Sequence, residues 1–208
     1  LALTPPRLQP QADQVDDQVD DQIADKDASY QRYQLNDSGV SPMSSPGLVD
    51  FQYTADGLTH NQGGLPSSRA QDHLQQLHKR EQKLSQFDYG EEWAHYHPIT
   101  TAKHIIITWG SSFEAVREAV AHLNAQGAKL SLIGLRLLMP LNAETLAKHT
   151  HKQKVLVIEQ NDSAQLYHYL LSEKAIPTES DAYAKPGPLL FKPTDIINHL
   201  QDWLEASA

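Results

Sequence analysis

The chain has 208 residues, a formal net charge of −9 at pH 7 and no cysteine. Without cysteine it can form no disulfide, and it cannot ligate an iron–sulfur cluster through thiolates of its own. Hydrophobic residues make up 39% of the chain and the mean hydropathy is −0.52, which is low for a chain folded evenly along its length. The composition therefore predicts a compact apolar part joined to a long polar part.

The distribution of apolar and charged residues also argues against a membrane, a secretion signal and a nucleic-acid partner. No apolar run is long enough to span a bilayer, and the first residues lack the charged-then-apolar pattern of a signal peptide. No basic patch is present, so nucleic acid is not an expected partner. We therefore expect a cytoplasmic protein without membrane contact.

The negative charge is concentrated near the N-terminus. Residues 13–27 contain seven Asp and one Lys, a net charge of −6. One aliphatic residue in every four could form a helical stripe, but the Asp side chains repel one another and Asp is a poor helix former. We therefore expect residues 1–29 to be an acidic, disordered linker.

Residues 30–100 are expected to form an irregular arm with one polar helix. Gly and Pro interrupt residues 30–66 at short intervals. Residues 67–86 have a helical pattern whose apolar stripe consists of Leu74, Leu77 and Leu84. Because a stripe this narrow buries little, the helix is expected to lie across a larger body. Residues 87–102 then bridge to the first strand.

Strand and helix patterns alternate from residue 101 to 208. Apolar, β-branched runs at 104–108, 130–135 and 154–159 predict strands. The alternation predicts an α/β domain, an open and mostly parallel sheet with helices on both faces. Ser111 and Glu114 have the spacing of a capping box at the start of the first helix.

Residues that typically begin or end helices predict the remaining elements of this domain. Asn142 can cap a short helix through about His149, and residues 164–171 form the next helix. Residues 172–188 are expected to be a loop, with a short last strand at Leu189–Phe191. Pro193 suits the first turn of a closing helix.

Two polar turns are candidate sites for an anion or a subunit interface. Gly110, Ser111 and Ser112 follow the first strand and open a helix, where free N–H groups favour phosphate. A tight turn with a serine cap explains them equally well. The second turn follows the third strand, and ligands in open α/β folds bind at the carboxyl ends of the strands. A hydrogen-bonded turn or a subunit contact also explains this turn. Its residues are Glu159, Asn161 and Gln165.

The other motifs do not indicate an independent enzyme. Two His-x-His pairs, at 95/97 and 149/151, supply too few ligands for a metal site. The chain contains neither a G-x-S-x-G nucleophile elbow nor a Walker A loop. We therefore assign no catalytic residue and no metal ligand from spacing alone.

Three stretches, taken together, resemble one known family. Residues 33–42 (YQLNDSGVSP) are similar to its Y-x-L-T-x-D-G-I-S-P-R segment, and 57–63 (GLTHNQG) with 79–84 (KREQKL) to its G-x-E-H-D-E-x-G and K-R-x-x-K-L segments. The third stretch resembles its W-G-S-T, L-R-x-L-x-P-x-P and E-x-N-x-x-G-Q motifs; it comprises 107–112, 135–141 and 159–165. In this way the chain resembles the C-terminal part of the alpha subunit of thiamine-diphosphate-dependent 2-oxoacid:ferredoxin oxidoreductases, most closely the 2-oxoglutarate type.

The resemblance implies a fold, partners and cofactors. It implies a core domain II, similar to the C-terminal domain of transketolase, over residues 101–208. The implied complex decarboxylates a 2-oxoacid, forms an acyl-CoA and passes electrons to ferredoxin. Thiamine diphosphate, Mg, an iron–sulfur cluster and coenzyme A would be bound with a beta subunit and a thiamine-binding domain, and this chain alone would bind none of them. The candidates for lying near the substrate are Gly39, Ser41, Pro42 and His60.

The chain also departs from the family pattern. Ser38 replaces an acidic residue, Met43 stands where arginine is usual, and Asn61-Gln62 neutralise an acidic pair. Ala164 replaces a glycine before Gln165. These changes predict either a shifted specificity or a relaxed site. An alternative to a structural subunit part is a stand-alone α/β binding or assembly module; a transketolase-like enzyme is disfavoured by residues 39–42 and 59–63.

Overall fold

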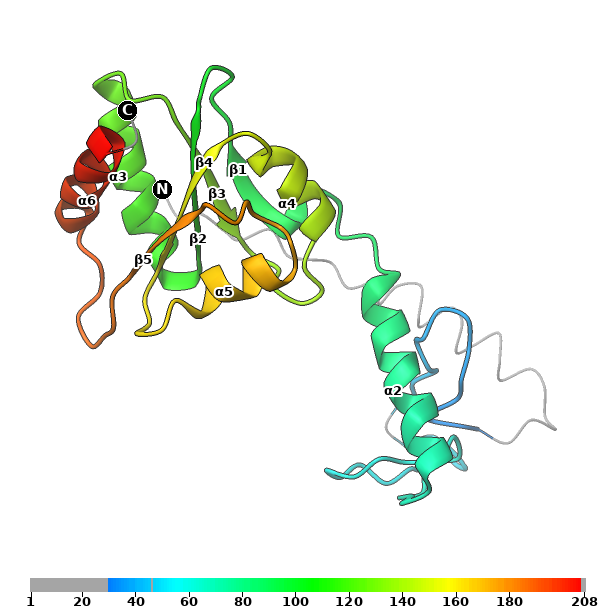
Figure 1. Ribbon diagram of the computed structural model, residues 1–208. Coiled ribbons are helices and arrows are strands. Elements are labelled where there is room, and N and C mark those ends of the chain that lie inside the picture. Colours follow the sequence, from blue (N-terminus) through cyan, green and yellow to red (C-terminus); the bar gives the residue numbers. More distant parts are fainter. Residues whose placement is uncertain (1–29, 46, 207–208) are drawn as a thin grey trace. The chain divides into compact units, whose positions relative to one another are not determined.

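The computed structural model describes residues 30–45 and 47–206 (Figure 1). The acidic linker expected over residues 1–29 lies outside this part. The chain divides into two compact units, Leu1–Asp88 and Tyr89–Ala208. The second unit therefore starts earlier than the expected boundary at residue 100, because it includes a strand that the sequence placed in the bridge.

Within the described residues, five strands of the second unit form one sheet in the order β1-β3-β2-β4-β5. β1 runs antiparallel to β3, and the other neighbouring strands are parallel. The expected open, mostly parallel sheet is confirmed. Its strands are β1 (Ala94–His97), β2 (His104–Trp109), β3 (Leu130–Leu135), β4 (Lys154–Glu159) and β5 (Asp181–Ala184).

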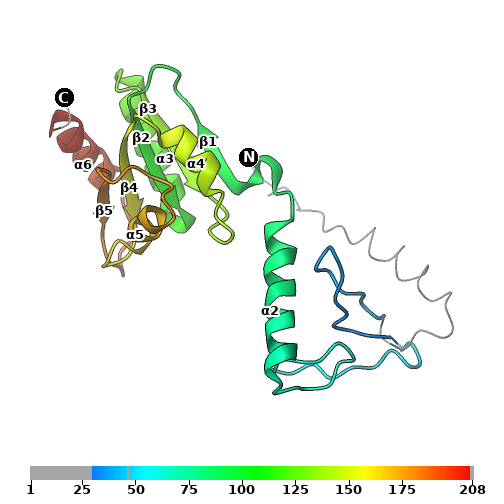
Figure 2. The same cartoon turned by 45° about the vertical axis from the view of Figure 1, so that its right-hand side comes forward.

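Helices cover both faces of this sheet (Figures 1 and 2). α3 (Phe113–Ala125) and α6 (Pro193–Ala206) lie on one face. α4 (Ala143–Thr150) and α5 (Gln165–Ser172) lie on the other. The order of the strands explains this division. The connection from β2 to β3 crosses the sheet in one direction, and the connection from β3 to β4 crosses back over β2 in the other direction. Right-handed crossovers then place their helices on opposite faces.

The central strand β2 shows why both faces need cover. Ile105 and Ile107 face a core that includes Leu146 of α4, whereas Ile106 faces a second core with Leu200 of α6. All three isoleucines are 2% exposed or less. A continuous β-branched run of this kind is typical of a parallel strand buried on both sides.

Two edge strands correct the expectations from sequence. Residues 94–97, expected in a bridge, form β1, and residues 181–184, expected in a loop, form β5. Leu189–Phe191, expected as the last strand, is irregular. Both edge strands have weak apolar patterns. Their extended conformation therefore depends on hydrogen bonds to the neighbouring strands β3 and β4 more than on local propensity.

Two helix starts also differ from expectation. Gly110–Ser112 forms a short 3-10 turn (η2), and neither Ser111 nor Ser112 caps α3 with its side chain. Glu114 instead accepts hydrogen bonds from Arg117, one turn further on, at 2.5 and 2.9 Å. The expected capping box is therefore wrong, because the 3-10 turn changes where the helix begins. Asn142 precedes α4 as expected, but its side chain makes no capping bond.

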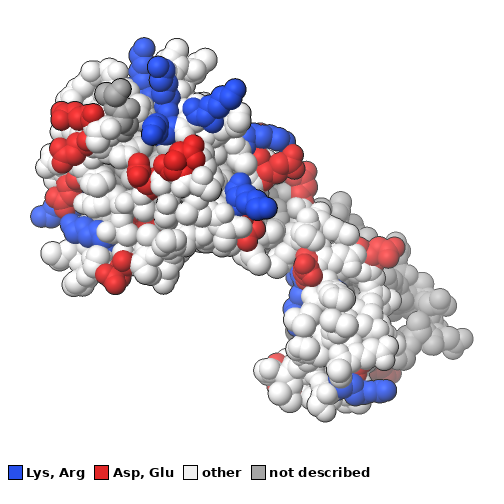
Figure 3. All heavy atoms as spheres, in the orientation of Figure 1, with Lys and Arg blue, Asp and Glu red and all other residues white. Residues whose placement is uncertain are grey.

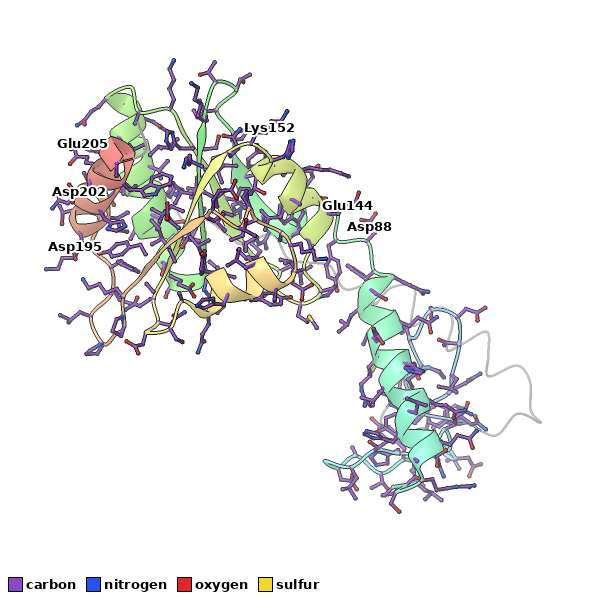
Figure 4. The ribbon with its side chains drawn as sticks, viewed as in Figure 1. Asp88, Glu144, Lys152, Asp195, Asp202 and Glu205 are labelled. Atoms are coloured by element: carbon purple, nitrogen blue, oxygen red, sulfur yellow. The ribbon has the colours of Figure 1, made fainter. Side chains whose placement is uncertain are left out.

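The surface of the second unit carries both signs of charge. Figure 3 shows basic and acidic side chains interspersed over the visible face of this unit. Figure 4 shows Asp195, Asp202 and Glu205 along α6, whereas Ile196 and Leu200 of that helix are fully buried. Among residues 30–45 and 47–206, no helix is long and apolar enough to cross a membrane.

Gly134 on β3 allows an aromatic ring to lie directly on the sheet. A Cβ added at Gly134 would lie 2.3 Å from two ring carbons of Phe113. The Phe113 ring also stacks on His95, with 5.1 Å between centroids, and His95 is the β1 partner of Gly134. Gly134 therefore sets how closely the start of α3 approaches the sheet.

We predict that Gly134→Ala lowers the free energy of unfolding by about 1–3 kcal/mol, because the Phe113 ring must move away from the new methyl group. In the background of Phe113→Ala the same change should have a much smaller effect. Urea denaturation of the two single variants and the double variant, followed by circular dichroism, measures the coupling. Strictly additive effects would show that the ring does not limit this position.

Candidate functional site

The first unit places the Gly39–Pro42 loop directly against helix α2 (Ala70–Ser85). Gly39 has a φ of +70°, which disfavours residues with a side chain. A Cβ added there would lie 2.7 Å from the Lys79 carbonyl oxygen and from the Lys83 backbone nitrogen. Glycine is therefore required both by the backbone conformation and by the contact with the helix.

Lys79 of α2 is the buried centre of this arrangement. Its Nζ donates to the carbonyl oxygens of Tyr33 (3.1 Å) and Gln34 (3.4 Å) and to Ser41 Oγ (2.6 Å). Ser41 Oγ in turn donates to the Gln34 carbonyl at 2.8 Å. Burial is the main reason that the pKa of Lys79 is lowered to about 8. The ammonium thus connects the helix to the loop without a carboxylate counter-ion in this set of contacts.

His60 also packs against Tyr33. It is 4% exposed, and its ring stacks on Tyr33 with 4.8 Å between centroids. Its Nε2 lies 3.3 Å from Asp56 Oδ1, and the Tyr33 backbone N–H donates to the Gln62 carbonyl at 3.1 Å. The structure therefore brings His60 and the Gly39–Pro42 loop together around Tyr33 and α2.

The structure corrects the buried face of α2. Leu74 and Leu77 are 53% and 42% exposed, and the buried residues of the helix are Gln76 and Lys79. Gln76 Nε2 donates to the Tyr33 carbonyl at 2.9 Å. The apolar pattern of the sequence did not predict this face, because the face is polar. Its side chains supply the hydrogen-bond donors that the carbonyls of an irregular loop need. The K-R-E-Q-K-L stretch, noted only for its resemblance, was the available signal.

In the second unit, Glu159 occupies the start of α5. It is fully buried, and its carboxylate accepts hydrogen bonds from the backbone N–H groups of Leu166 (2.7 Å) and Tyr167 (2.9 Å). Asn161 donates to the same carboxylate and accepts from the Gln165 N–H at 3.3 Å. A helix N-terminus favours such a negative partner. An external anion would have to displace Glu159, so the geometry favours a hydrogen-bonded turn.

Both candidate turns lie at the same edge of the sheet. β2 lies between β3 and β4, and the chain passes from β2 to β3 before crossing back to β4. The topological switch point, where α/β folds bind ligands, is therefore between the carboxyl ends of β2 and β4. Gly110 and Ser111 are exposed at the end of β2, whereas Ser112 is buried. Glu159 and Asn161 lie at the end of β4.

The histidine pairs take part in aromatic packing. The rings of His95 and His97 stack on Phe113, and His149 packs 4.3 Å from Tyr96 between ring centroids. In the part of the chain that the structure describes, no group of three or more His, Asp or Glu side chains could hold a metal ion. These residues therefore do not fit a Mg²⁺ site, and a chain without cysteine does not fit a cysteine-ligated cluster.

Comparison with protein families and curated proteins gives one consistent result. Residues 102–184 match the model of the pyruvate:ferredoxin oxidoreductase core domain II. The 2-oxoacid:ferredoxin oxidoreductase 2 alpha subunit of Aeropyrum pernix is 27% identical over 168 residues, 79% of this chain and 26% of that protein. That of Saccharolobus solfataricus is 27% identical over 135 residues, 63% of this chain and 21% of its own length. The chain spans about a quarter of these relatives.

One solved structure agrees with this result. The 2-oxoglutarate:ferredoxin oxidoreductase from Magnetococcus marinus, solved with 2-oxoglutarate, coenzyme A and succinyl-CoA bound, superposes with a TM-score of 0.71. It is 30% identical and covers 86% of this chain, which corresponds to 32% of that one. A split-gene transketolase is a much weaker match, with a TM-score of 0.45 and 14% identity.

The second unit is thus an α/β domain of the core domain II class. The chain is related to the alpha subunits of 2-oxoacid:ferredoxin oxidoreductases, as its motifs indicated. The expected fold is confirmed, and the comparisons agree with the resemblance to this family that the motifs carry.

One departure from the family pattern has a visible structural consequence. Ala164, at the position where the resemblance expects glycine, has φ 49° and ψ 49°. This left-handed conformation is strained for a residue with a Cβ. It is imposed by the turn that brings the start of α5 onto the Glu159 carboxylate.

We predict that Ala164→Gly raises the free energy of unfolding by about 1 kcal/mol, because it removes this strain. Urea denaturation measures the change. Ala102→Gly is the matched control, since Ala102 is not among the residues with positive φ, and it should lower stability. Equal losses in both variants would show that the turn does not strain Ala164.

A second pair of variants tests the loop of the first unit. Gly39→Ala should detach the loop from α2, because overpacking against backbone atoms destabilises by about 1–3 kcal/mol. Gly47 also has a positive φ, but an added Cβ would meet nothing within 4 Å. Hydrogen exchange of residues 33–42 should therefore accelerate in Gly39→Ala far more than in Gly47→Ala. Equal acceleration would mean that φ alone, without the helix contact, requires glycine.

Proposed function

We propose that the chain is the C-terminal, mainly structural part of a 2-oxoacid:ferredoxin oxidoreductase alpha subunit. In this proposal the assembled complex oxidatively decarboxylates a 2-oxoacid, with 2-oxoglutarate as the substrate, forms an acyl-CoA and passes electrons to ferredoxin. The motif order along the chain and the likeness to the Magnetococcus marinus enzyme support it.

The observation that carries the assembly role is the composition of the first unit. Among residues 30–45 and 47–88, no apolar side chain is buried; the buried side chains are those of Ser41, His60, Gln76 and Lys79. Val49, Leu58 and Leu65 are each at least 65% exposed. A segment this small and without an apolar core is not expected to hold its shape alone. Exposed apolar side chains of this density mark a protein interface.

The proposed partners follow from the same argument. The first unit would pack against the thiamine-binding domain and the beta subunit of the complex, whose apolar surfaces would complete its core. Thiamine diphosphate, Mg and the iron–sulfur cluster would belong to those partners, since the described residues do not fit a metal site. The role of the Gly39–Pro42 loop and His60 would be to approach the substrate from this side, and ferredoxin would meet the complex elsewhere.

The test is reconstitution. The chain is combined with its beta partner and the upstream alpha fragment, and 2-oxoacid-dependent viologen reduction is measured with 2-oxoglutarate and with pyruvate. We expect activity only when the chain is present, and a lower KM for 2-oxoglutarate than for pyruvate. Identical activity without the chain would refute the proposal.

A surface variant separates assembly from catalysis. Replacing Leu58 and Leu65 with Ser should weaken association with the partners, measured by sedimentation velocity, because both side chains would lose their apolar cover. Gln71→Ser, an exposed polar position on α2, is the matched control and should bind normally. A stable monomer with no affinity for either partner would instead favour a stand-alone α/β binding or assembly module.

A further inference from the structure

The Gly39–Pro42 loop has few interactions of its own. Within it, the Asn36 side chain donates to the Val40 carbonyl at 2.5 Å and the Val40 N–H donates to Ser38 Oγ at 3.2 Å. Val40 and Met43 are 40% and 53% exposed, so apolar burial does not anchor the loop. Its connection to the rest of the unit depends on the contact of Gly39 with α2 and on polar contacts from outside the loop.

Lys79 supplies the polar contact from α2 to Ser41. Its three ammonium protons have three acceptors, the Tyr33 and Gln34 carbonyls and Ser41 Oγ. Two further contacts are longer, since the Tyr30 hydroxyl and Arg32 Nη1 each reach the Pro42 carbonyl at 3.4 Å. Gln82 of α2 donates to the Asp37 carbonyl just before the loop. Ser41 is therefore joined to α2 through a single, nearly buried side chain.

The groups that face Lys79 add no negative charge. Arg32 and Tyr33 face it from the loop segment, with Nζ 5.6 Å from the Tyr33 ring centre. On α2 itself, the nearby charged groups are Arg80 and Lys83. No ion pair to Lys79 occurs among the described residues. A buried cation held only by neutral oxygens is suited to fixing backbone carbonyls in place.

We propose that Lys79 is the positioning residue that holds the Gly39–Pro42 loop on α2 and thereby sets how tightly the 2-oxoacid is bound. The part that concerns the substrate rests on the proposed function, whereas the part that concerns the loop does not. Nothing in this role requires Lys79 to touch the substrate, because it acts through Ser41 and the backbone of residues 33–42.

The proposal implies a pH dependence. Burial, and then the charges of Arg32, Arg80 and Lys83, lower the pKa of Lys79 from 10.5 to about 8. Between these two values, the docked loop binds fewer protons than the released loop. Docking therefore strengthens as pH rises from about 8 towards 10.5, and it is independent of this group below pH 8.

The chain offers a direct reporter for the loop. It has two methionines; Met43 follows the loop, and Met139 lies in the second unit and serves as an internal reference. With ¹³C-methyl methionine, NMR relaxation of the Met43 methyl group reports loop order in the full-length chain. Substituting each methionine with Leu assigns the two signals.

Four variants then test the loop. Lys79→Leu should increase the mobility of Met43 and remove its pH dependence between pH 7 and 10, whereas Lys79→Arg should retain order without that dependence, because Arg does not titrate there. Ser41→Ala removes the hydroxyl that accepts from Lys79 and donates to the Gln34 carbonyl, and it should loosen the loop in a folded unit. Lys83→Leu, an exposed lysine one turn further on, is the matched control and should leave the order of Met43 at pH 7 as in the wild type. An unchanged Met43 signal in both Lys79→Leu and Ser41→Ala would overturn the proposal.

Measurements of activity test the proposed effect of Lys79 on binding of the 2-oxoacid. In the reconstituted complex, Lys79→Leu should raise the KM for the 2-oxoacid about tenfold with a much smaller change in kcat, the pattern of lost substrate binding, and Lys79→Arg should restore it in part. A loosened loop with an unchanged KM would overturn the link to substrate. If the wild-type complex shows no 2-oxoacid activity, the proposed function fails, while the Met43 signal still decides whether Lys79 holds the loop.

Discussion

The second unit depends on one constraint, the covering of a parallel sheet on both faces. β2 lies at its centre, and its consecutive isoleucines alternate between two cores. The helices must therefore divide between the faces, and the reversal of direction after β3 achieves this. The Trp203 indole N–H donates to Asp181 Oδ2 at 2.8 Å, which joins the closing helix to the edge strand β5. Because the side chains of the central strands are buried in these two cores, any chemistry of this unit is confined to the turns at the strand ends.

The first unit is organised by the opposite principle. Its buried side chains are polar, and they satisfy the carbonyls of an irregular segment instead of forming an apolar core. Hydrogen bonds to Gln76 and Lys79 define the shape of this segment but contribute little net stability, since water competes for the same groups when it opens. Its exposed leucines and Val49 supply the missing apolar burial only if another surface covers them. The two units therefore differ in what orders them: an apolar core in the second unit, and hydrogen bonds from polar side chains in the first.

The same contrast explains what the sequence could and could not predict. β2, β3 and β4 were predictable, because their β-branched runs are long and buried on both faces. β1 and β5 were not, since pairing with a neighbour forms them in the absence of a strong local pattern. In the candidate site, Gly39, Ser41 and His60 were predicted through the family motifs, and their role near a substrate stays a prediction. Lys79 was missed as a buried residue, because hydrophobic periodicity assigns a lysine to the surface and the loop that it satisfies is distant in sequence.

The departures from the family pattern can now be interpreted physically. Ser38 replaces an acidic residue, and its hydroxyl donates to Asn36 Oδ1 and accepts from the Val40 N–H, each at 3.2 Å. Asn61 and Gln62 replace an acidic pair, and their side-chain oxygens accept the N–H groups of Leu65 and Leu35, each at 3.1 Å. Each neutral replacement is thus engaged in a turn.

Relative to the family pattern, these replacements remove negative charge from the first unit, and Met43 removes a positive charge beside the loop. A site that had simply degenerated would be expected to lose loop geometry along with charge. Here the turns of the first unit are hydrogen-bonded and the distribution of charge differs from the family pattern, which argues against simple loss of the loop structure.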